Sequence, residues 1–564
     1  MSVRRLIGLE TEYGIHAPAN PRASHVALSI ELINAYAAQV TEAGGAVAGT
    51  EWDYQSESPL VDARGWVLPR SAAHPSQLTD TPEALVDALG NVSGGDPTPA
   101  DSAEREFTPP GSAHWRGDFF ELQEGQPQLL MNLVLGNGAR FYVDHAHPEY
   151  SAPETIGAKR AVLYDVAGDV VARTAASRLS AEPGSPEILL YKNNTDNKSV
   201  SYGAHENYLV PRRIPFDNLI NGLIPFFVTR QITSGAGRVG IGQQAQTPGY
   251  QISQRADFFE EQVGLETTVR RPIINTRDEP HAHYDSWRRL HVIIGDANMS
   301  EYSAWIRVGT TALVLDLIEH GKAPDIRLID PVQALKVISH DPSLTVKVPT
   351  NRGPMSAVEI QREYLIAALE HARSASTPGL PDTAPDTETA EVLEAWEELL
   401  TDLAEEPSRA ADRVDWLAKL QLLESYRRRD GLDWDSATLG MIDLQYHDLR
   451  PEKGLYYKLA RAGRMRRLFT DEQINWAAQH PPEETRAWLR GTLITEHSQA
   501  IAGASWDQIL LRPDPAAAPV RLQLSNPFTG ARTETEPVLR TAADTPAMVQ
   551  GLQQLLEQNP AGHQ

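Results

Sequence analysis

The segment Asn137–Glu154, NGARFYVDHAHPEYSAPE, constrains the fold of this chain more than any other feature of its sequence. Its first half is apolar and aromatic enough to form a strand, and Tyr142 and Asp144 are two positions apart in it. Side chains two positions apart on a strand point to the same face of the sheet. Pro148 predicts the end of the strand, with Glu149 delivered at the turn that follows. The segment therefore predicts a strand that presents Asp144 close to a second acidic residue, Glu149.

A second pair of acids with the same spacing lies near the N-terminus, where Glu10 and Glu12 occur in the strand-like run RRLIGLETEYGI. Carboxylates on one strand face repel one another, and a bound cation offsets that repulsion. Gly8 and Gly14 flank the pair and permit close approach of a ligand or a backbone. Together the two segments favour a magnesium-dependent enzyme built on a sheet. An exposed, salt-bridging strand face is the alternative for Glu10 and Glu12.

Asp144 has three candidate roles: metal ligand, general base and carboxylate nucleophile. The alternative is an aspartate that caps a turn. Its neighbours include Arg140, His145 and His147, a dense polar group for so short a stretch. Both histidines are expected on the strand face opposite to Asp144, which favours structural roles for them.

Length, charge and cysteine content limit the class of protein. The chain has 564 residues, enough for a large core and more than one domain. Its 51 basic and 75 acidic residues give a formal charge of −24, which argues against nucleic-acid binding. It contains no cysteine, which excludes disulfides and thiolate metal sites. Without a signal-peptide pattern or an apolar run of roughly 20 residues, we expect a soluble, cytoplasmic protein with no membrane partner.

The hydrophobic pattern predicts a mixture of helices and strands. Helices are expected near 25–43, 157–180, 216–232 and 300–320, and strands near 3–14, 271–276 and 289–296. The segments PEILLYKNNTD and SVSYGAHENYLV are expected to pair around a turn. Residues 44–128 show little periodicity and form a long insertion, in which the aromatic segment 52–66 is expected to pack on something.

The later part of the chain suggests a second unit. A Pro- and Thr-rich connector at 376–388 precedes a strongly helical block. Towards the end come a helix, a Trp-containing strand, a Pro-rich turn and a final helix. We expect a catalytic domain over 1–480, with the insertion at about 44–128, and a small C-terminal domain over 481–564.

Two further segments carry candidate ligands. YGAHENY supplies His205 and Asn207, and a later strand places Arg289 and His291 on one face. Arginine suits phosphate contacts and a neutral imidazole is a common metal ligand, whereas a core histidine and a salt-bridged strand edge are the alternatives. GAGRVG (235–240) matches GxGxxG but follows a helical segment, so we reject a dinucleotide site and expect a flexible loop. The P-loop and GxSxG motifs are absent.

Six segments together resemble one protein family. They are GLETEYGI, NGARFYVDHAHPEYSAPE, YKNNTDNKSVSYGAHENYL, SQRADF, INTRDEPHAHYDSWRRLHVIIGDANMSE and VGTTALVLDLIE. In this order they are similar to the Pup ligase/deamidase family, which acts on the prokaryotic ubiquitin-like protein Pup. The resemblance covers almost the whole chain. It implies an α+β, glutamine-synthetase-like fold, in which a curved antiparallel β-sheet forms a cradle backed by helices and a small C-terminal domain closes over the nucleotide.

The family has two branches. Ligases attach Pup to lysines and hydrolyse ATP, whereas deamidases convert the C-terminal glutamine of Pup to glutamate and also remove Pup from conjugates. The deamidase branch carries an extra loop before the aspartate strand, and the long insertion of this chain lies there, with 95–128 longer than the usual form. The resemblance therefore favours the deamidase branch. The alternatives are a Pup–protein ligase, a catalytically silent regulator that binds Pup or ATP, and a generic carboxylate–amine ligase.

The resemblance also implies roles for residues of this chain. Asp144 matches the catalytic aspartate, acting as nucleophile or as the base that activates water. Magnesium-associated positions match Glu10, Tyr142, Glu149, His205 and His291, and nucleotide-binding positions match Arg140, Ser151, Ala152, Asn207, Arg289 and Trp506. ATP is implied as a cofactor that is not consumed in each turnover, together with Mg²⁺.

The implied partners are Pup and pupylated proteins, and a monomer is expected. Pup is acidic, so this acidic chain needs local basic surface to bind it. The candidates are 269–271, Arg255, 425–429 and 458–467. Pup is expected to fold on binding, with apolar helix faces laid into a groove.

Overall fold

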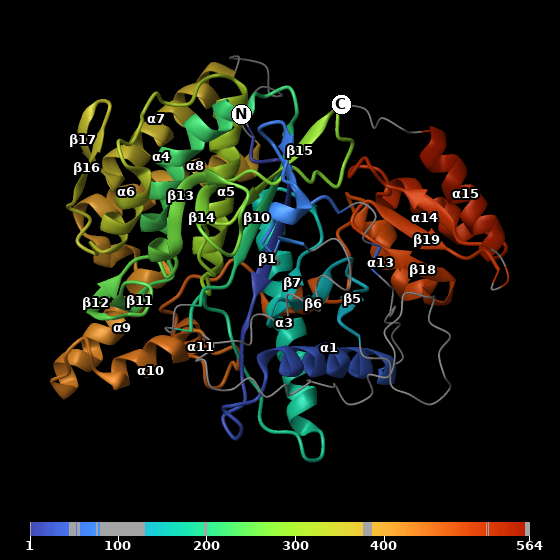
Figure 1. Cartoon of the computed structure of the whole chain (residues 1–564), viewed down its shortest axis with the longest axis horizontal. Helices are drawn as coiled ribbons and strands as arrows, with labels where there is room; N and C mark the ends of the chain where they lie inside the picture. The colour runs from blue at the N-terminus through green and yellow to red at the C-terminus, as the bar shows by residue number, and fades with distance from the viewer. Residues whose placement is uncertain are drawn as a thin grey trace.

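An antiparallel sheet lies at the centre of the computed structural model (Figure 1), which describes residues 2–43, 52–53, 57–74, 77–78, 130–196, 200–375, 386–514, 516 and 518–558. Its strands run in the order β15–β10–β1–β7–β6–β5, and β8 also pairs with β1. The strands are β1 (Leu6–Glu12), β5 (Asn132–Val134), β6 (Arg140–Asp144), β7 (His147–Ser151), β8 (Thr155–Ile156), β10 (Ala204–Pro211) and β15 (Trp287–Val292). Sheet and helices together confirm the predicted α+β fold class.

The two faces of this sheet differ because side chains alternate along each strand. One face is apolar and buried, as at Leu9, Phe141 and Tyr150. The helices packed against it are α1 (His25–Glu42), α3 (Ala158–Ala181) and α5 (Glu301–Glu319). Since helices cover the apolar face, the polar face is left to carry the candidate site.

A layer of helices continues from α5 away from the sheet (Figure 1). Helix α5 is buried along most of its length, and the side chain of its N-cap Ser300 accepts a hydrogen bond from the amide of Ser303. The other helices of the main body are α4 (Phe216–Ser234), α6 (Pro331–Ser339), α7 (Ala357–Ala375), α8 (Thr387–Glu405), α9 (Asp415–Asp430), α10 (Ala437–Tyr446), α11 (Leu455–Arg461) and α12 (Asp471–Ala477). The predicted helices near 25–43, 157–180, 216–232 and 300–320 are confirmed.

Short strand pairs surround the main sheet. They are β2 (Gly14–His16) with β9 (Leu189–Tyr191), β3 (Val61–Asp62) with β4 (Trp66–Val67), β11 (Arg238–Ile241) with β12 (Thr247–Gln251), β13 (Phe259–Gly264) with β14 (Arg271–Asn275), and β16 (Lys347–Thr350) with β17 (Gly353–Ser356). The pair β13–β14 is parallel, and the others are antiparallel.

The last part of the chain has its own hydrophobic cluster, which includes Leu489, Leu511 and Leu552. Its elements are α13 (Ala487–Glu496), β18 (Ile501–Ala504), β19 (Gln508–Leu511), β20 (Val520–Gln523), α14 (Arg532–Thr541) and α15 (Thr545–Gln558). They lie together at one side of the molecule (Figure 1). The buried carboxylate of Glu154 accepts hydrogen bonds from Arg486 (2.6 Å) and Arg490 (2.5 Å), which attaches this part to the main sheet.

The structure corrects the predicted course of the aspartate strand. Pro148 does not end a strand but lies inside β7, opposite Val143 of β6. The chain reverses earlier, at His145 and Ala146. Glu149 therefore lies in the middle of a strand between β6 and β1, and not at a turn.

Two other local predictions need correction. The segments around β9 and β10 do meet, through the antiparallel bridge between Thr195 and Ser201, but their strands pair elsewhere: β9 pairs with β2, and β10 pairs with β1 and β15. GAGRVG is not a flexible surface loop but a buried segment that runs into β11. Gly237 has a φ of +72°, and a Cβ there would meet Tyr250 and Trp416.

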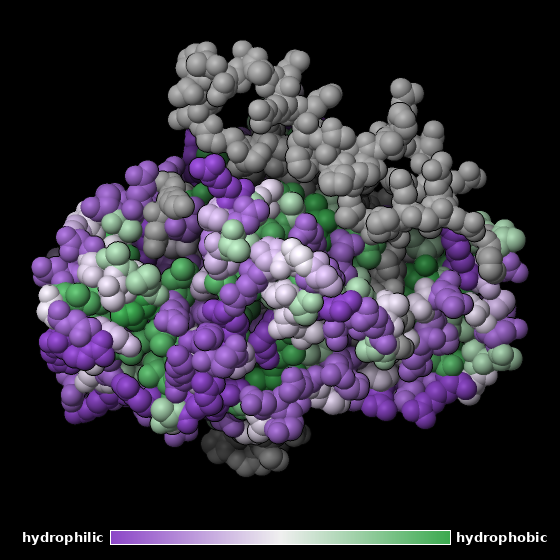
Figure 2. Space-filling model, turned by 90° about the horizontal axis from the view of Figure 1, so that it is seen from below, coloured by the Kyte–Doolittle hydropathy of each residue, from purple (hydrophilic) through white to green (hydrophobic). Residues whose placement is uncertain are grey.

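Hydrophilic residues predominate on the face seen in Figure 2, with hydrophobic residues scattered between them. No helix among the described residues is long and apolar enough to cross a membrane. Of the insertion at 44–128, the structure describes 52–53, 57–74 and 77–78, so the prediction for 95–128 lies outside the described residues.

Candidate active site

Strand register brings most of the predicted site residues onto the polar face of the sheet. Across β1, Glu10 lies opposite both His205 of β10 and Ser151 of β7. Glu12 lies opposite Glu149. Residues directly opposite each other on antiparallel strands share a face. The residues on this face are Glu10, Glu12, Arg140, Tyr142, Asp144, Glu149, Ser151, His205, Asn207, Arg289 and His291.

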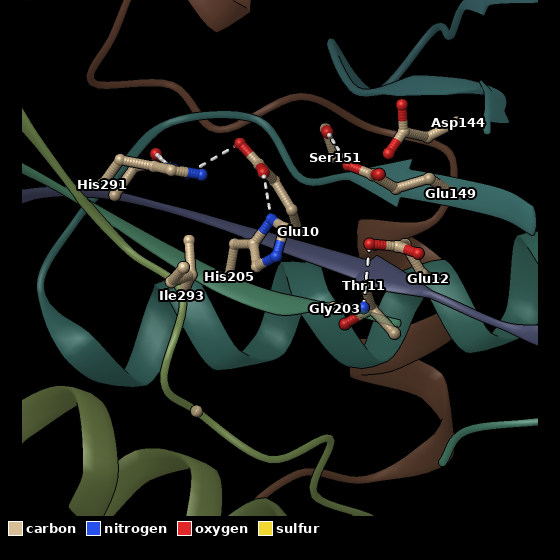
Figure 3. A network of polar contacts seen from close by, with 12 residues as sticks. Glu10, Thr11, Glu12, Asp144, Glu149, Ser151, Gly203, His205, His291 and Ile293 are labelled. Atoms are coloured by element: carbon tan, nitrogen blue, oxygen red, sulfur yellow. Dashed lines mark hydrogen bonds and ion pairs between the residues drawn. The ribbon is translucent and has the colours of Figure 1, made fainter. Parts of the chain in front are cut away.

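The first polar cluster surrounds Glu10 (Figure 3). Its carboxylate is 3.2 Å from Nδ1 of His205 and accepts a 2.8 Å hydrogen bond from Asn207. One donor atom each of Glu10, His205 and His291 lies within 4.8 Å of the others. Burial opposes ionisation of Glu10, but His205, His291 and Arg289 outweigh it and hold the Glu10 pKa below its usual range. Burial, with the nearby Arg289, lowers the pKa of His291, so its ring is neutral at pH 7 and able to bind a metal.

The second cluster consists of Glu12, Asp144 and Glu149, whose donor atoms also lie within 4.8 Å of one another. Burial and the nearby Asp144 raise the pKa values of both Glu12 and Glu149. Asp144 differs, because the charge and hydrogen bond of His145, 3.0 Å away, outweigh its burial and lower its pKa. The cluster thus combines an ionised aspartate with two carboxyl groups whose ionisation is opposed, and a cation among them would relieve the repulsion.

Tyr142 belongs to the second cluster through Glu149. Its hydroxyl donates a 2.6 Å hydrogen bond to Glu149, which also accepts from the hydroxyl of Ser151 at 3.2 Å. Burial and the carboxylate of Glu149 raise the pKa of Tyr142 well above its ordinary value, so the phenol stays protonated. Glu10 and Glu12, two positions apart on β1, join the two clusters into one site.

The structure corrects the strand face predicted for the two histidines beside Asp144. The strand was expected to continue past them, but the turn at 145–146 brings His145 within 3.0 Å of the Asp144 carboxylate. His147 pairs with Asp144 across the hairpin, on the same face, and its Nδ1 lies 3.5 Å from Glu12. Burial and the charge of His145 lower the pKa of His147 to about 3. Both rings therefore border the second cluster.

The predicted nucleotide-binding residues do not all face the same way. Arg289 donates hydrogen bonds to Asn207 (2.9 Å) and to Glu279 (3.1 Å), beside the first cluster. Ser151 lies between the two clusters. Ala152 differs, because its side chain is buried in the core and its amide donates to the backbone oxygen of Leu9. Its side chain therefore does not line the polar face.

A row of rings and guanidinium groups connects the sheet to the C-terminal part. The guanidinium of Arg140 lies 3.8 Å from the ring centre of Tyr142 and 3.9 Å from that of Trp52. The rings of Trp52 and Trp506 meet edge to face at 5.4 Å. Trp52 also bridges Ala504. The row therefore places Trp506, which sequence analysis predicted, and Trp52, which it did not, at the border of the site.

The insertion contributes a carboxyl group that sequence analysis missed. Glu57 accepts a 2.9 Å hydrogen bond from the indole of Trp52, and the next amide, of Ser58, donates to Glu279. Burial and the nearby Glu279 raise the pKa of Glu57 to about 8. Glu279, held by Arg289, has a pKa of about 2, because its neighbouring cations outweigh burial. The aromatic residues of 52–66 were the one sequence signal that this segment packs against the protein.

The sequence matches the family model described as Pup-ligase protein over residues 5–510. The chain belongs to this family. The curated relatives include a depupylase from Acidothermus cellulolyticus, 43% identical over 97% of this chain and 100% of the relative, and a Pup deamidase/depupylase from Mycolicibacterium smegmatis, 42% identical over 98% and 100%. A Pup–protein ligase from Pseudarthrobacter chlorophenolicus is 42% identical over 64% of this chain and 80% of the ligase. The family resemblance of the motifs is thereby confirmed.

Solved ligase structures share the fold. The ligase PafA in its complex with Pup superposes with a TM-score of 0.71 at 28% identity, over 99% of this chain and 95% of that one. PafA in complex with ADP gives a TM-score of 0.65 at 33% identity, over 76% and 91%. The glutamine-synthetase-like α+β fold class implied by the resemblance agrees with these neighbours.

Proposed function

We propose that this protein hydrolyses amides at the C-terminal residue of Pup: the primary amide of a terminal glutamine and the isopeptide bond to a lysine. The observation that carries the proposal is the extent of the similarity. Relatives named as depupylases match 97% and 98% of this chain, whereas the ligase relative matches 64%. The packing of Trp52 and Glu57 from the insertion beside the polar face supports the same branch.

Asp144 is the proposed catalytic residue. Amide hydrolysis needs a nucleophile, stabilisation of the developing oxyanion and a proton for the departing nitrogen. The lowered pKa of Asp144 keeps its carboxylate ionised at neutral pH, so it can attack the amide carbon or take a proton from water. His145, 3.0 Å away, holds that carboxylate in position, and the two routes stay open.

Magnesium and ATP are part of the proposal. Of the residues predicted to hold Mg²⁺, the carboxylates fit best, because Mg²⁺ prefers oxygen ligands and His205 and His291 offer nitrogen. The raised pKa values of Glu12 and Glu149 are those expected of carboxylates that lack a compensating cation. A bound Mg²⁺ would offset the charge of the carboxylates and the phosphates.

The nucleotide is proposed to bind along Arg140, Ser151, Asn207 and Arg289, with Trp506 at the edge. A solved relative, 33% identical, holds ADP. Arginine side chains match phosphate geometry, and Arg140 and Arg289 lie on the face that carries both acidic clusters. The residues from 481 onwards, proposed as a small C-terminal domain after a catalytic domain of 1–480, supply Trp506.

The variant Asp144→Asn tests the proposal. With ATP, Mg²⁺ and Pup ending in glutamine, we expect the wild type to convert glutamine to glutamate, read by intact-mass spectrometry, and the variant to lose at least about 10³-fold in rate. The control is the variant Asp325→Asn. Asp325 is 75% exposed and lies between α5 and α6, outside the strands that carry the site, so this variant should keep the wild-type rate.

Two outcomes would contradict the proposal. An Asp144→Asn variant that deamidates at the wild-type rate would exclude Asp144 as the catalytic residue. The ligase alternative is tested with Pup ending in glutamate and a lysine acceptor. If the wild type forms an isopeptide bond and releases ADP there, while leaving Pup with terminal glutamine unchanged, the chain is a ligase.

A further inference from the structure

Two groups of side chains with metal-binding chemistry lie outside both clusters of the candidate active site: Glu57, Glu279 and His281, which adjoin Arg289, and a second group on helices α5 and α7. Asp316 lies in the last turn of α5, His320 caps the C-terminal end of that helix four residues later, and His371 comes from the neighbouring helix α7. One donor atom of each lies within 4.8 Å of the other two. Nε2 of His371 is 3.1 Å from the Asp316 carboxylate, and the two histidine rings are 4.8 Å apart.

The position of Asp316 is unfavourable for a carboxylate without a cation. The C-terminal end of a helix carries a partial negative charge, and the last turn of α5 contains no basic residue. The nearby Arg5 pairs with Glu319 at 2.7 Å. Asp316 itself is 14% exposed, so water screens its charge poorly.

His371 faces Asp316 from the neighbouring helix, with Nε2 3.1 Å from the carboxylate. A neutral imidazole carries a lone pair that binds transition metals. The His371 side chain is 10% exposed.

Within the part of the chain that the structure describes, Nδ1 of His371 is buried and has no hydrogen-bond partner. Nε2 of the same ring has the Asp316 carboxylate as its 3.1 Å neighbour. Buried polar groups are otherwise almost always satisfied in folded proteins. An unpartnered imidazole nitrogen beside a half-buried carboxylate is a set of donor atoms that a metal ion can bind.

The third member makes the group accessible from solvent. The His320 side chain is 54% exposed, and its Nδ1 lies 2.8 Å from the backbone oxygen of Asp316, so the ring folds back towards Asp316. Residues four apart on a helix share a face, as metal ligands on one helix require.

We propose that Asp316, His320 and His371 form a binding site for a divalent transition-metal ion of the zinc class. Two imidazole nitrogens and one carboxylate oxygen are a common donor set for Zn²⁺, with water as the fourth ligand, whereas Mg²⁺ prefers oxygen ligands. Zinc–ligand bonds of about 2.0–2.1 Å place tetrahedral donors about 3.3 Å apart. Small side-chain shifts bring the present donors to that spacing, and the ion then clamps the end of α5 to α7.

The test uses the full-length protein with Mg²⁺ present throughout. After incubation with ZnCl₂ and desalting, the zinc content of the protein is measured by inductively coupled plasma mass spectrometry. The melting temperature of the protein is recorded with and without zinc. The exposed variant His320→Ala should lose one equivalent of zinc relative to the wild type, together with most of the zinc-induced rise in melting temperature. His371→Ala, which alters a buried position, should lose the same equivalent.

Two controls separate this site from other histidines. His205→Ala removes a candidate ligand in the active site. Any zinc that this variant fails to bind should add, in the double variant, to the zinc lost by His320→Ala. His480→Ala removes a histidine that stacks on Trp476 and should change nothing. If His320→Ala and His371→Ala bind as much zinc as the wild type, the proposal is wrong. An equal loss in His480→Ala, or displacement of zinc by equimolar Mg²⁺, would also overturn it.

Discussion

Glu57 links the inserted segment to the candidate nucleotide site, and its protonation should control that contact. Its carboxyl group accepts from Trp52 and lies beside Glu279, which in turn is held by Arg289. Because the pKa of Glu57 is about 8 and that of Glu279 about 2, the pair holds one proton at neutral pH, on Glu57. Glu57→Gln keeps an acceptor for Trp52 and removes the titration.

The sign and size of the effect follow from linkage. The pKa of Glu57 rises from its ordinary 4.5 to about 8 in the folded protein, so the docked segment binds more protons than the released one. Docking therefore loses stability as the pH rises through this interval. One pKa unit corresponds to about 1.4 kcal/mol, which gives about 4 kcal/mol between pH 4.5 and 7.5 for a fully buried group. Glu57 keeps partial contact with water, so we expect about 2 kcal/mol.

Hydrogen exchange read by mass spectrometry measures this docking locally. Corrected for the pH dependence of chemical exchange, protection of residues 57–74 should be equal in the wild type and Glu57→Gln at pH 4.5. At pH 7.5 the variant should be about 30-fold better protected, which is the ratio for about 2 kcal/mol. Glu260→Gln, an exposed acid on β13, is the matched control and should follow the wild type. Equal protection of wild type and variant at both pH values would refute the reasoning.

Two further substitutions test the interior and the ring stack. Arg230→Met removes the 2.6 Å ion-pair partner of the fully buried Glu206 and leaves it the hydroxyl of Tyr208 and the more distant Arg307, at 3.5 Å. We expect a loss of about 3 kcal/mol in urea unfolding, with Glu206→Gln in the same chain restoring most of it. No loss on Arg230→Met would mean that Arg307 and Tyr208 suffice. Arg140→Lys keeps the charge but loses the planar stack on Trp52, so protection of the described insertion should fall about fivefold. Unchanged protection would assign the docking to other contacts.

Much of the polar face could be predicted because side chains two positions apart on a strand point to the same face of the sheet. Glu10 with Glu12, and Tyr142 with Asp144, were placed on common faces from spacing alone, and the register sets these two pairs on the same side of the sheet. The helices near the site were predicted for a similar reason, since their apolar periodicity spans many turns. Roles for individual residues came from the family resemblance and stay predictions.

The turn beside Asp144 was missed because its local signal was misleading. His145 takes the left-handed conformation, with a φ of 52°, in a position where asparagine or glycine is the usual indication. Pro148 was interpreted as a strand terminator, although in β7 it lies opposite Val143, where its missing N–H is tolerated. One misplaced turn moved both His145 and His147 to the wrong face.

The aromatic residues of 52–66 predicted that this part of the insertion packs against the protein, but local pattern could not identify its partners. Trp52 meets Trp506 and Arg140, which are far away along the chain. The pairing of β2 with β9 was missed for the same reason. Long-range pairing depends on which surfaces remain uncovered after the main sheet forms, and spacing within a segment carries no information about that.

The two acidic clusters differ in how their negative charge is balanced, and this difference indicates which of them has the greater need for a bound cation. Glu10 already has Arg289 at 3.9 Å and two histidines beside it, and its pKa is low. At Glu12 and Glu149, burial and the charge of Asp144 outweigh the nearby histidines and hydrogen bonds, and their pKa values are raised. The need for a cation is therefore greatest next to Asp144. A cation there would relieve the repulsion between the carboxylates and keep Asp144 ionised, which both proposed routes of amide hydrolysis require.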